Sequence, residues 1–491
     1  MAALLLLALA TSLFAQLPDS ACARCHAKIA ASYRRTAMAQ TSGSVFRIRR
    51  PPQASPPLSI DLNWHAKVNG IERDIVYHVG SGRVGRSYLN EVDGILFQFP
   101  FSSYTATNRF AASPGYDHSQ RLDFSRAVEP ACLQCHSAAK PHDTPAPAMF
   151  NGVSCERCHG SGDQHIKNPM RGNIVNPGRL PAEERDSVCA QCHLTGVARV
   201  ATLRGEQQDY LPGQRLQDFV AIFTQASVNE QLSVTGHTER LALSRCQQAS
   251  AGKLWCATCH DPHSEPAPTQ RVAYFRSKCE SCHTAKNTCS LPLTQRQAKS
   301  NDCTACHMPK SPTQGIDHSA STDHAILRTP ASPRQGAGGL RPWWPTQADL
   351  TRETALAHAV LKSPDAIPSL RAALAKFPSD KRLNLQLAQL LPPSEALPFY
   401  ERALPLPAAS VNVGIAKAEA KLFEQAMSHW RDALRIEPAN SAARLNLVQA
   451  WIRLNEPGRA LAELNILLRY DPDRPELQRL AAQLKARLSP P

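Results

Sequence analysis

The stretch Gly152–His165 reads GVSCERCHGSGDQH, and its pattern decides how the whole chain is interpreted. Two cysteines stand three positions apart, a histidine follows the second cysteine directly, and another histidine comes six residues later. The same Cys-x-x-Cys-His pattern occurs seven times in the 491 residues. A random chain with 16 cysteines and 18 histidines would contain roughly 0.02 copies of it. The pattern therefore reflects a chemical requirement.

That requirement is covalent attachment of haem. Two thiols at this spacing can each form a thioether to one of the two vinyl groups of a haem, and the following histidine is held under the iron as its proximal ligand. Zinc knuckles and redox-active dithiols also use paired cysteines, but neither needs a histidine after every pair. The sequence predicts seven c-type haems. Their attachment and proximal residues are Cys22, Cys25, His26, Cys132, Cys135, His136, Cys155, Cys158, His159, Cys189, Cys192, His193, Cys256, Cys259, His260, Cys279, Cys282, His283, Cys303, Cys306 and His307.

The remaining histidines indicate what lies on the other side of each iron, because haem iron takes a second axial ligand unless it binds substrate. Two histidines, His358 and His429, fall in C-terminal helical repeats, which leaves nine for seven distal positions. This near match favours haems with two histidine ligands, which suit electron transfer. The candidate distal ligands are His165, His237, His263, His318 and His324. Four more histidines could be either distal ligands or surface residues: His65, His78, His118 and His142.

Two of the candidates follow a motif closely. We expect the Gly-Ser-Gly loop to present His165 to a neighbouring haem rather than to its own. His263, three residues after His260, stands on the wrong side to reach the same iron but is placed for an adjacent one. Met38 is a further candidate, as an axial thioether for the first haem, and would raise that haem's potential.

The first residues have the pattern of a targeting signal. Residues 1–15, MAALLLLALATSLFA, form an apolar run that ends in small residues and predicts a secretory signal peptide. Because the run lacks a basic start, a short retained anchor is the alternative. No other run is long enough for a membrane span, so we expect a periplasmic or otherwise exported bacterial protein. In an oxidising compartment the two cysteines outside the motifs, Cys246 and Cys289, could form a disulfide.

The net charge of +14 would ordinarily suggest an acidic partner such as nucleic acid. Seven haems would add about 14 negative charges on their propionates, while each ferric iron adds about one positive charge to its porphyrin core. Much of the basic excess therefore compensates the cofactor. No nucleic-acid motif accompanies the basic residues, and we expect no nucleic-acid partner.

The chain divides into segments of different character. After the signal peptide, 16–57 is a first haem-binding segment, and 58–128 reads as a β-rich insertion with a hairpin signal at Asp93-Gly94. Residues 129–328 hold six motifs with little room for an apolar core, so haem itself should be the core, and this region should not fold without it. Residues 329–350 are a Pro/Gly-rich linker. The cytochrome part is predicted to be mostly α-helical and irregular.

Residues 351–491 are predicted to form an all-α solenoid. A 34-residue period with small residues at the helix crossing and proline after the second helix is typical of tetratricopeptide repeats, and an ordinary helical bundle is the alternative. Such repeats stack into a concave surface that binds a peptide or protein, here a redox partner, and we find no catalytic constellation in them. The matching positions are Ala426, Ala433 and Pro438 against Ala460, Leu467 and Pro472, with less regular copies at Ala366, Ala373, Pro378, Ala396 and Ala403.

The chain also resembles a known family, the bacterial multihaem cytochromes c related to the tetrahaem carrier of ammonia oxidisers and to hydroxylamine oxidoreductase. The resemblance is carried between residues 20 and 328 by CARCHAKIAASYRRTAMA, GSGRVGRSYL, SPGYD, CERCHGSGDQH, SRCQQASAGKLWCATCHDPH, DCTACHMPK and TDHAILR. It implies an exported protein whose closely stacked haems pass electrons along a chain. Relatives often carry histidine within the GSG phrase, where this chain has Arg83 and Val84, so one iron could lack its distal ligand.

Three functions follow from this pattern. The first is electron transfer through covalently bound haems, with the repeats docking a protein partner. The second is a haem oxidoreductase that converts a small nitrogen or sulfur species at one five-coordinate iron. The third is a scaffold or haem-based sensor acting through its repeats. All seven motifs end in histidine, whereas multihaem nitrite reductases mark their catalytic haem with lysine, and no tyrosine stands out for the cross-link of the oxidase branch. The sequence therefore favours an electron carrier and identifies no catalytic residue.

Overall fold

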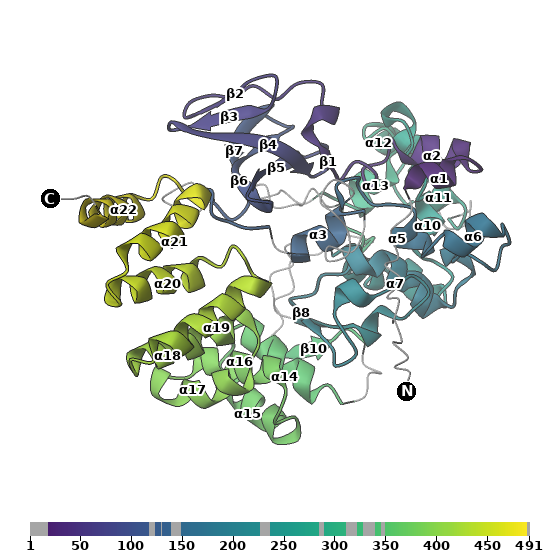
Figure 1. Ribbon diagram of the computed structural model, residues 1–491. Helices are drawn as coiled ribbons and strands as arrows, with labels where there is room; N and C mark the ends of the chain where they lie inside the picture. The colour runs from purple at the N-terminus through teal and green to yellow at the C-terminus, as the bar shows by residue number, and fades with distance from the viewer. Residues whose placement is uncertain are drawn as a thin grey trace, which may run out of the picture.

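The structure is a computed structural model that describes residues 18–116, 123–128, 130–138, 149–225, 236–283, 289–310, 322–327, 339–344 and 349–488. Figure 1 shows a seven-stranded sheet, a region of short helices that carries the Cys-x-x-Cys-His motifs, and an arc of paired helices at the C-terminal end. The predicted signal peptide and the histidines at 118, 142 and 318 lie outside the described residues. Within the described part of the chain, no helix has the length and apolar character needed to cross a membrane.

The large sheet is antiparallel and contains the predicted hairpin. Val92 pairs with Ile95 across the turn, and both turn residues have left-handed backbones, with φ of 53° at Asp93 and 77° at Gly94. Two-residue turns of this kind match the twist of the flanking strands. The strands run in the order β2 (Leu58–Ile60), β3 (His65–Val68), β4 (Ile71–Val79), β5 (Gly85–Val92), β6 (Ile95–Tyr104) and β7 (Arg109–Ala112), and β1 (Ser42–Ser44) pairs with β4.

The motif region consists of short helices and loops. Between residues 236 and 310, not one hydrophobic side chain among the described residues is buried. Protein interiors are normally packed by such side chains, so this part of the chain lacks a core of its own. Its helices are α1 (Asp19–Ala23), α2 (Ala27–Tyr33), α3 (Pro130–His136), α5 (Glu156–His159), α6 (Asp163–Lys167), α7 (Ala182–His193), α8 (His237–Ala242), α9 (Arg245–Ala249), α10 (Cys256–Cys259), α11 (Arg271–Glu280), α12 (Leu293–Gln297) and α13 (Cys303–His307).

A second, three-stranded sheet was not expected from the sequence. It is antiparallel, in the order β10 (Leu340–Pro342), β9 (Val220–Gln225), β8 (Ala198–Ala201). Strand β10 lies inside the segment interpreted as a linker, and the partly buried Trp343 and Trp344 that follow pack against a buried cluster around Leu194. Part of the predicted linker is therefore structural.

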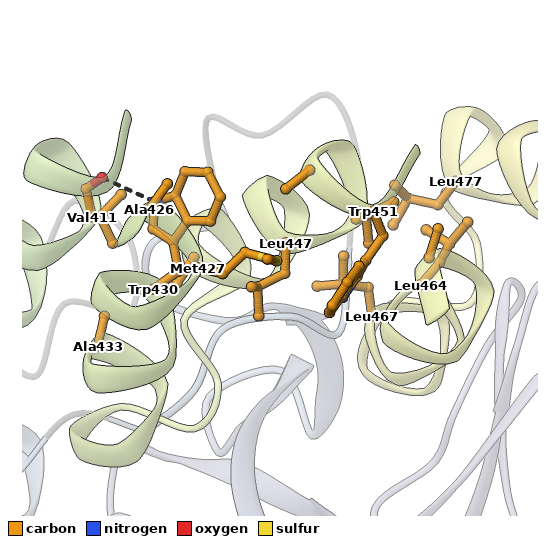
Figure 2. Close-up of a cluster of buried hydrophobic side chains, with 14 of the residues drawn as sticks. Val411, Ala426, Met427, Trp430, Ala433, Leu447, Trp451, Leu464, Leu467 and Leu477 are labelled. Atoms are coloured by element: carbon orange, nitrogen blue, oxygen red, sulfur yellow. Dashed lines mark hydrogen bonds between the residues drawn. The ribbon is translucent and has the colours of Figure 1, made fainter. Parts of the chain in front are cut away.

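The C-terminal helices form antiparallel pairs. Figure 2 shows the core of those that follow residue 406, in which the indole N–H of Trp430 donates a hydrogen bond to the carbonyl of Val411 over 3.1 Å. Ala426 and Ala433, which the period places at the helix crossing, are fully buried there. The helices are α14 (Thr351–Val360), α15 (Ala366–Lys376), α16 (Lys381–Leu390), α17 (Pro393–Arg402), α18 (Pro407–Glu419), α19 (Phe423–Ile436), α20 (Ser441–Arg453), α21 (Pro457–Tyr470) and α22 (Pro475–Leu488).

Both ends of this helical arc contact the rest of the chain. At its start, the guanidinium of Arg352 donates to the carbonyl of Ala201 on β8 over 2.7 Å. Near its end, Arg469 pairs with Asp93 at the hairpin turn over 2.8 Å, and the rings of Tyr470 and Phe97 have centroids 5.1 Å apart. The repeats are therefore braced against the large sheet as well as joined to the motif region (Figure 1).

Candidate haem-binding sites

Each motif forms about one helical turn. The backbone N–H of the motif histidine donates to the carbonyl of the first cysteine, over 2.9 Å at His26, 3.0 Å at His159 and 2.9 Å at His283. In a helix, positions i, i+3 and i+4 share one face, so the two thiols and the imidazole of a motif project to the same side. This local geometry is what a haem held by two thioethers and one imidazole needs.

Thiols from different motifs also meet in pairs. Pairing of this kind places the attachment sites of neighbouring motifs side by side, although the motifs lie far apart in the sequence. In one pair, a hydrogen bond from Cys135 lowers the pKa of Cys192 to about 7. The hydrogen-bonded thiol pairs are Cys22 with Cys155, Cys135 with Cys192, Cys189 with Cys256, and Cys279 with Cys303.

Two imidazole pairs are spaced as the axial ligands of one iron would be. Metal–imidazole bonds of about 2 Å on opposite sides of an ion put the two ring centroids about 6 Å apart. The rings of His26 and His165 have centroids 6.3 Å apart and planes 14° from parallel. Those of His159 and His263 are 5.9 Å apart and 9° from parallel. In both pairs a motif histidine lies beside a histidine that the sequence nominated as a distal ligand.

Four further imidazoles form a row. His260 and His324 have centroids 6.2 Å apart with planes at 31°. His193 and His237 approach more closely, at 5.1 Å and 77°, with their Nδ1 atoms 3.3 Å apart, so these two rings must separate before an iron fits between them. His237 also meets His324 edge to face, at 4.8 Å. Burial lowers the pKa of His260 to about 4, which keeps its ring neutral, as a metal ligand must be.

Hydrogen bonds at Nδ1 orient several of these rings. An imidazole that donates its Nδ1 proton to a carbonyl keeps the Nε2 lone pair for a metal. Sequence patterns do not reveal this arrangement, because the acceptors are backbone atoms. Among the described residues it occurs at two motif histidines and two candidate distal ligands, and also at His78 with the carbonyl of Gly80. The Nδ1 distances are 2.8 Å from His159 to the carbonyl of Val175, 2.8 Å from His307 to Leu327, 3.1 Å from His165 to Met170 and 2.7 Å from His324 to Thr322.

His136 differs, because its Nδ1 lies 2.6 Å from the side-chain oxygen of Thr41. Sequence reasoning missed Thr41, which lies 95 residues from His136. Helix α3 positions His136 and includes Cys132, whose side chain lies outside the described residues. The donor sets as a whole, paired thiols with imidazoles close by, fit covalently bound haem.

The other nominated histidines lie in the large sheet. His65 is on β3, exposed, and its Nδ1 bonds the carboxylate of Asp74 over 2.7 Å. His78 is buried on β4, where its Nε2 lies against the backbone of Gly43. In the part of the chain that the structure describes, neither ring lies beside the ring of a motif histidine, as the rings of His165 and His263 do.

The structure also shows the contacts of Met38 and Arg83 and the state of the two cysteines outside the motifs. The backbone carbonyl of Met38 accepts a hydrogen bond from the N–H of Val153. Arg83, in the GSG phrase, forms an ion pair with Glu265. Cys246 and Cys289 are both free thiols, so the disulfide considered from the sequence is not formed in the structure.

Comparison with known proteins finds a cytochrome family, a repeat family and a multihaem relative. The family model "Cytochrome c554 and c-prime" matches residues 102–160, and a tetratricopeptide repeat model matches residues 417–484. A multiheme cytochrome, MtrA of Shewanella baltica (strain OS185), is 27% identical over 177 residues, which are 32% of this chain and 53% of that protein. The chain thus spans about half the length of this curated relative.

Two solved structures align over most of the chain at low similarity. The outer cell wall cytochrome OcwA aligns with 88% of this chain and 99% of its own, at 16% identity and a TM-score of 0.44. The undecaheme cytochrome from the S-layer of Carboxydothermus ferrireducens aligns with 85% of this chain and 69% of its own, at 15% identity and a TM-score of 0.34.

The motifs, the two family models and the curated relative agree with one another. A specific relation to the carriers of ammonia oxidisers or to hydroxylamine oxidoreductase is a finer distinction than they make. They identify the chain as a multihaem c-type cytochrome that continues into tetratricopeptide repeats at its C-terminus.

Proposed function

We propose that this protein is an exported electron carrier that holds seven c-type haems and passes electrons between them. The observation that carries the proposal is the pairing of motif histidines with distant histidines at the separation of two axial ligands, above all His26 with His165 and His159 with His263. An iron with two imidazole ligands has no open position for substrate and suits electron transfer.

The proposed ligand pairs follow from this geometry. We assign His165, His263, His237 and His324 as distal ligands opposite His26, His159, His193 and His260 respectively. Three motif histidines remain, and three nominated histidines fall outside the described residues. For the irons of His136, His283 and His307, the histidines at 118, 142 and 318 stay candidates from the sequence alone.

Bound haem supplies an iron that takes up and gives up one electron. The chain's own residues fix where those irons lie. The thiol contacts between motifs bring neighbouring attachment sites together, and the Nδ1 hydrogen bonds hold the rings of His159 and His307 in one orientation. Fixed ligands reduce the rearrangement that accompanies a change of oxidation state, and hydrogen bonds at Nδ1 tune the ligand's basicity.

The setting of this carrier is also part of the proposal. We infer a periplasmic or otherwise exported location from the predicted signal peptide at residues 1–15. Tetratricopeptide repeats bind proteins, so a redox protein partner is the proposed occupant of their surface.

Two measurements on the purified, processed holoprotein test the proposal. Its mass should exceed that of the polypeptide by seven haems, and a Cys155→Ala/Cys158→Ala variant should lose one. Low-temperature electron paramagnetic resonance with a spin count should find every iron low-spin. A mass increase of two or three haems would sink the proposal. One high-spin iron would instead favour the enzyme alternative, with nitrite, hydroxylamine and tetrathionate as the first substrates to try.

A further inference from the structure

Helix α8, which carries His237, has no buried residue. A six-residue helix without an apolar anchor is marginal on its own, so its position depends on contacts with neighbouring segments. Because His237 meets both His193 and His324, any shift of α8 would move its imidazole relative to two other rings. The residues that hold this helix therefore control the geometry of the row of four imidazoles.

Two adjacent side chains on α8 make such contacts. One carboxylate oxygen of Glu239 accepts hydrogen bonds from the backbone N–H groups of Thr195 and Gly196, over 2.8 and 2.5 Å. These two residues follow His193 almost directly, so Glu239 attaches α8 to the fourth motif. Arg240, one turn beyond His237, points to a different segment.

Arg240 forms a bidentate ion pair with Asp323. Its Nε and Nη2 donate to the two carboxylate oxygens over 2.9 and 2.7 Å, and the two side chains are only 16% and 11% exposed. Paired planar groups of this kind restrict both distance and orientation, and burial protects them from screening by salt. Asp323 directly precedes His324, so this contact links the helix of one distal imidazole to the segment of another.

Asp323 is itself held in place on its own segment. Its Oδ1 accepts from the backbone N–H of Ala325 over 2.8 Å, and its own N–H donates to the carbonyl of Pro309 over 2.9 Å. Four residues further on, the Leu327 carbonyl accepts from Nδ1 of His307. Residues 322–327 therefore contact the surroundings of the fourth, fifth and seventh motifs at once.

We propose that Arg240 and Asp323 are a positioning pair that sets His237 and His324 opposite His193 and His260. The inference rests on the proposed haem ligation and adds to it the residues that determine ligation at two neighbouring irons. Neither side chain is a ligand. Both act through the backbone. Arg240 lies three residues after His237, and Asp323 lies directly before His324.

The test compares holoprotein variants Arg240→Gln and Asp323→Asn with the unchanged protein, first by mass and then by spin count. Asp323→Asn keeps the oxygen that caps Ala325, so the local turn is preserved. We expect the full haem complement in both variants, with one or two irons converted from low-spin to high-spin. Added imidazole should restore the low-spin signal, because a small ligand can occupy a position that a displaced histidine has left.

A matched control is Arg444→Gln. Arg444 pairs with Glu463 in the repeats over 2.7 Å, with exposures of 11% and 26%, remote from the motifs in sequence. It should change no spin state. The positioning role is overturned if both Arg240→Gln and Asp323→Asn keep every iron low-spin, or if both lose haem or helical structure and added imidazole restores nothing. A wrong haem count in the unchanged protein would instead overturn the proposed function, so the two failures are distinguishable.

Discussion

Gly414 lies so close to the indole of Trp430 that a Cβ added at this glycine would overlap the ring. The indole cannot retreat freely, because its N–H is bonded to Val411. We expect Gly414→Ala to lower the free energy of unfolding of the repeats by about 1 to 3 kcal/mol, as overpacking does.

The matched control for that substitution is Gly458→Ala in α21. A Cβ there meets only Leu488, at 4.0 Å, and alanine is the better helix former. We expect Gly458→Ala to be neutral or to stabilise the repeats by up to about 1 kcal/mol. Thermal unfolding of both variants, followed by circular dichroism, checks the contrast, and equal destabilisation by the two would contradict it.

Arg352 supports the junction between the repeats and the motif region. Its guanidinium is 4% exposed and lies 2.5 Å from Asp380 and 3.0 Å from Glu353. Arg352→Met would leave two buried carboxylates without a cation, so we expect a loss of about 3 to 5 kcal/mol. Arg371→Met, which removes an exposed pair with Glu395, should change stability by less than about 1 kcal/mol. Denaturant unfolding of the two variants measures the difference, and similar losses would refute this account.

Two contacts join the last repeat to the large sheet, an exposed ion pair and a buried ring contact. Arg469 and Asp93 are 51% and 39% exposed, so Arg469→Ala should cost less than about 1 kcal/mol. Tyr470 is buried against Phe97, and Tyr470→Ala should cost about 3 to 5 kcal/mol. Proteolysis of the folded protein should release the C-terminal helices from the second variant sooner than from the first. The reverse order would show that the ion pair dominates.

His78 should make the stability of the sheet depend on pH. Burial lowers its pKa to about 4, and the nearby charges of Arg86 and Arg47 act in the same direction. The folded chain therefore keeps this imidazole neutral between pH 6.5 and 4, while the unfolded chain takes up a proton. The free energy of unfolding should fall as pH falls through that window, by at most about 3 kcal/mol from this group.

A His78→Gln variant isolates this contribution. Unfolding midpoints measured from pH 7 to 4 should decline less steeply in the variant than in the unchanged protein. If the two declines are parallel, His78 is not the group responsible.

Local patterns predicted the haem motifs and the hairpin at Asp93-Gly94, because each depends on residues a few positions apart, and a 34-residue period predicted the repeats. The three-stranded sheet escaped prediction because β10 is short and pairs with β9 across more than a hundred residues. The partner of each motif histidine is also set by long-range folding. The sequence could nominate His165 and His263, but it could not say which ring each would face. No sequence pattern indicated Thr41 or the backbone carbonyls that accept hydrogen bonds from the histidines. Arg240 and Asp323, in contrast, lie within three residues of the nominated ligands His237 and His324, so a search of their sequence neighbours could have found them.

The absence of buried apolar side chains among the described residues from 236 to 310 has a consequence for the order of assembly. A segment that gains its interior only when haem is attached stays open until then, so its thiols remain within reach of the attachment machinery. The repeats that follow residue 406 contain a buried core of their own and can form earlier. We expect a copy that misses one haem to keep an open stretch that is more sensitive to protease than the complete holoprotein.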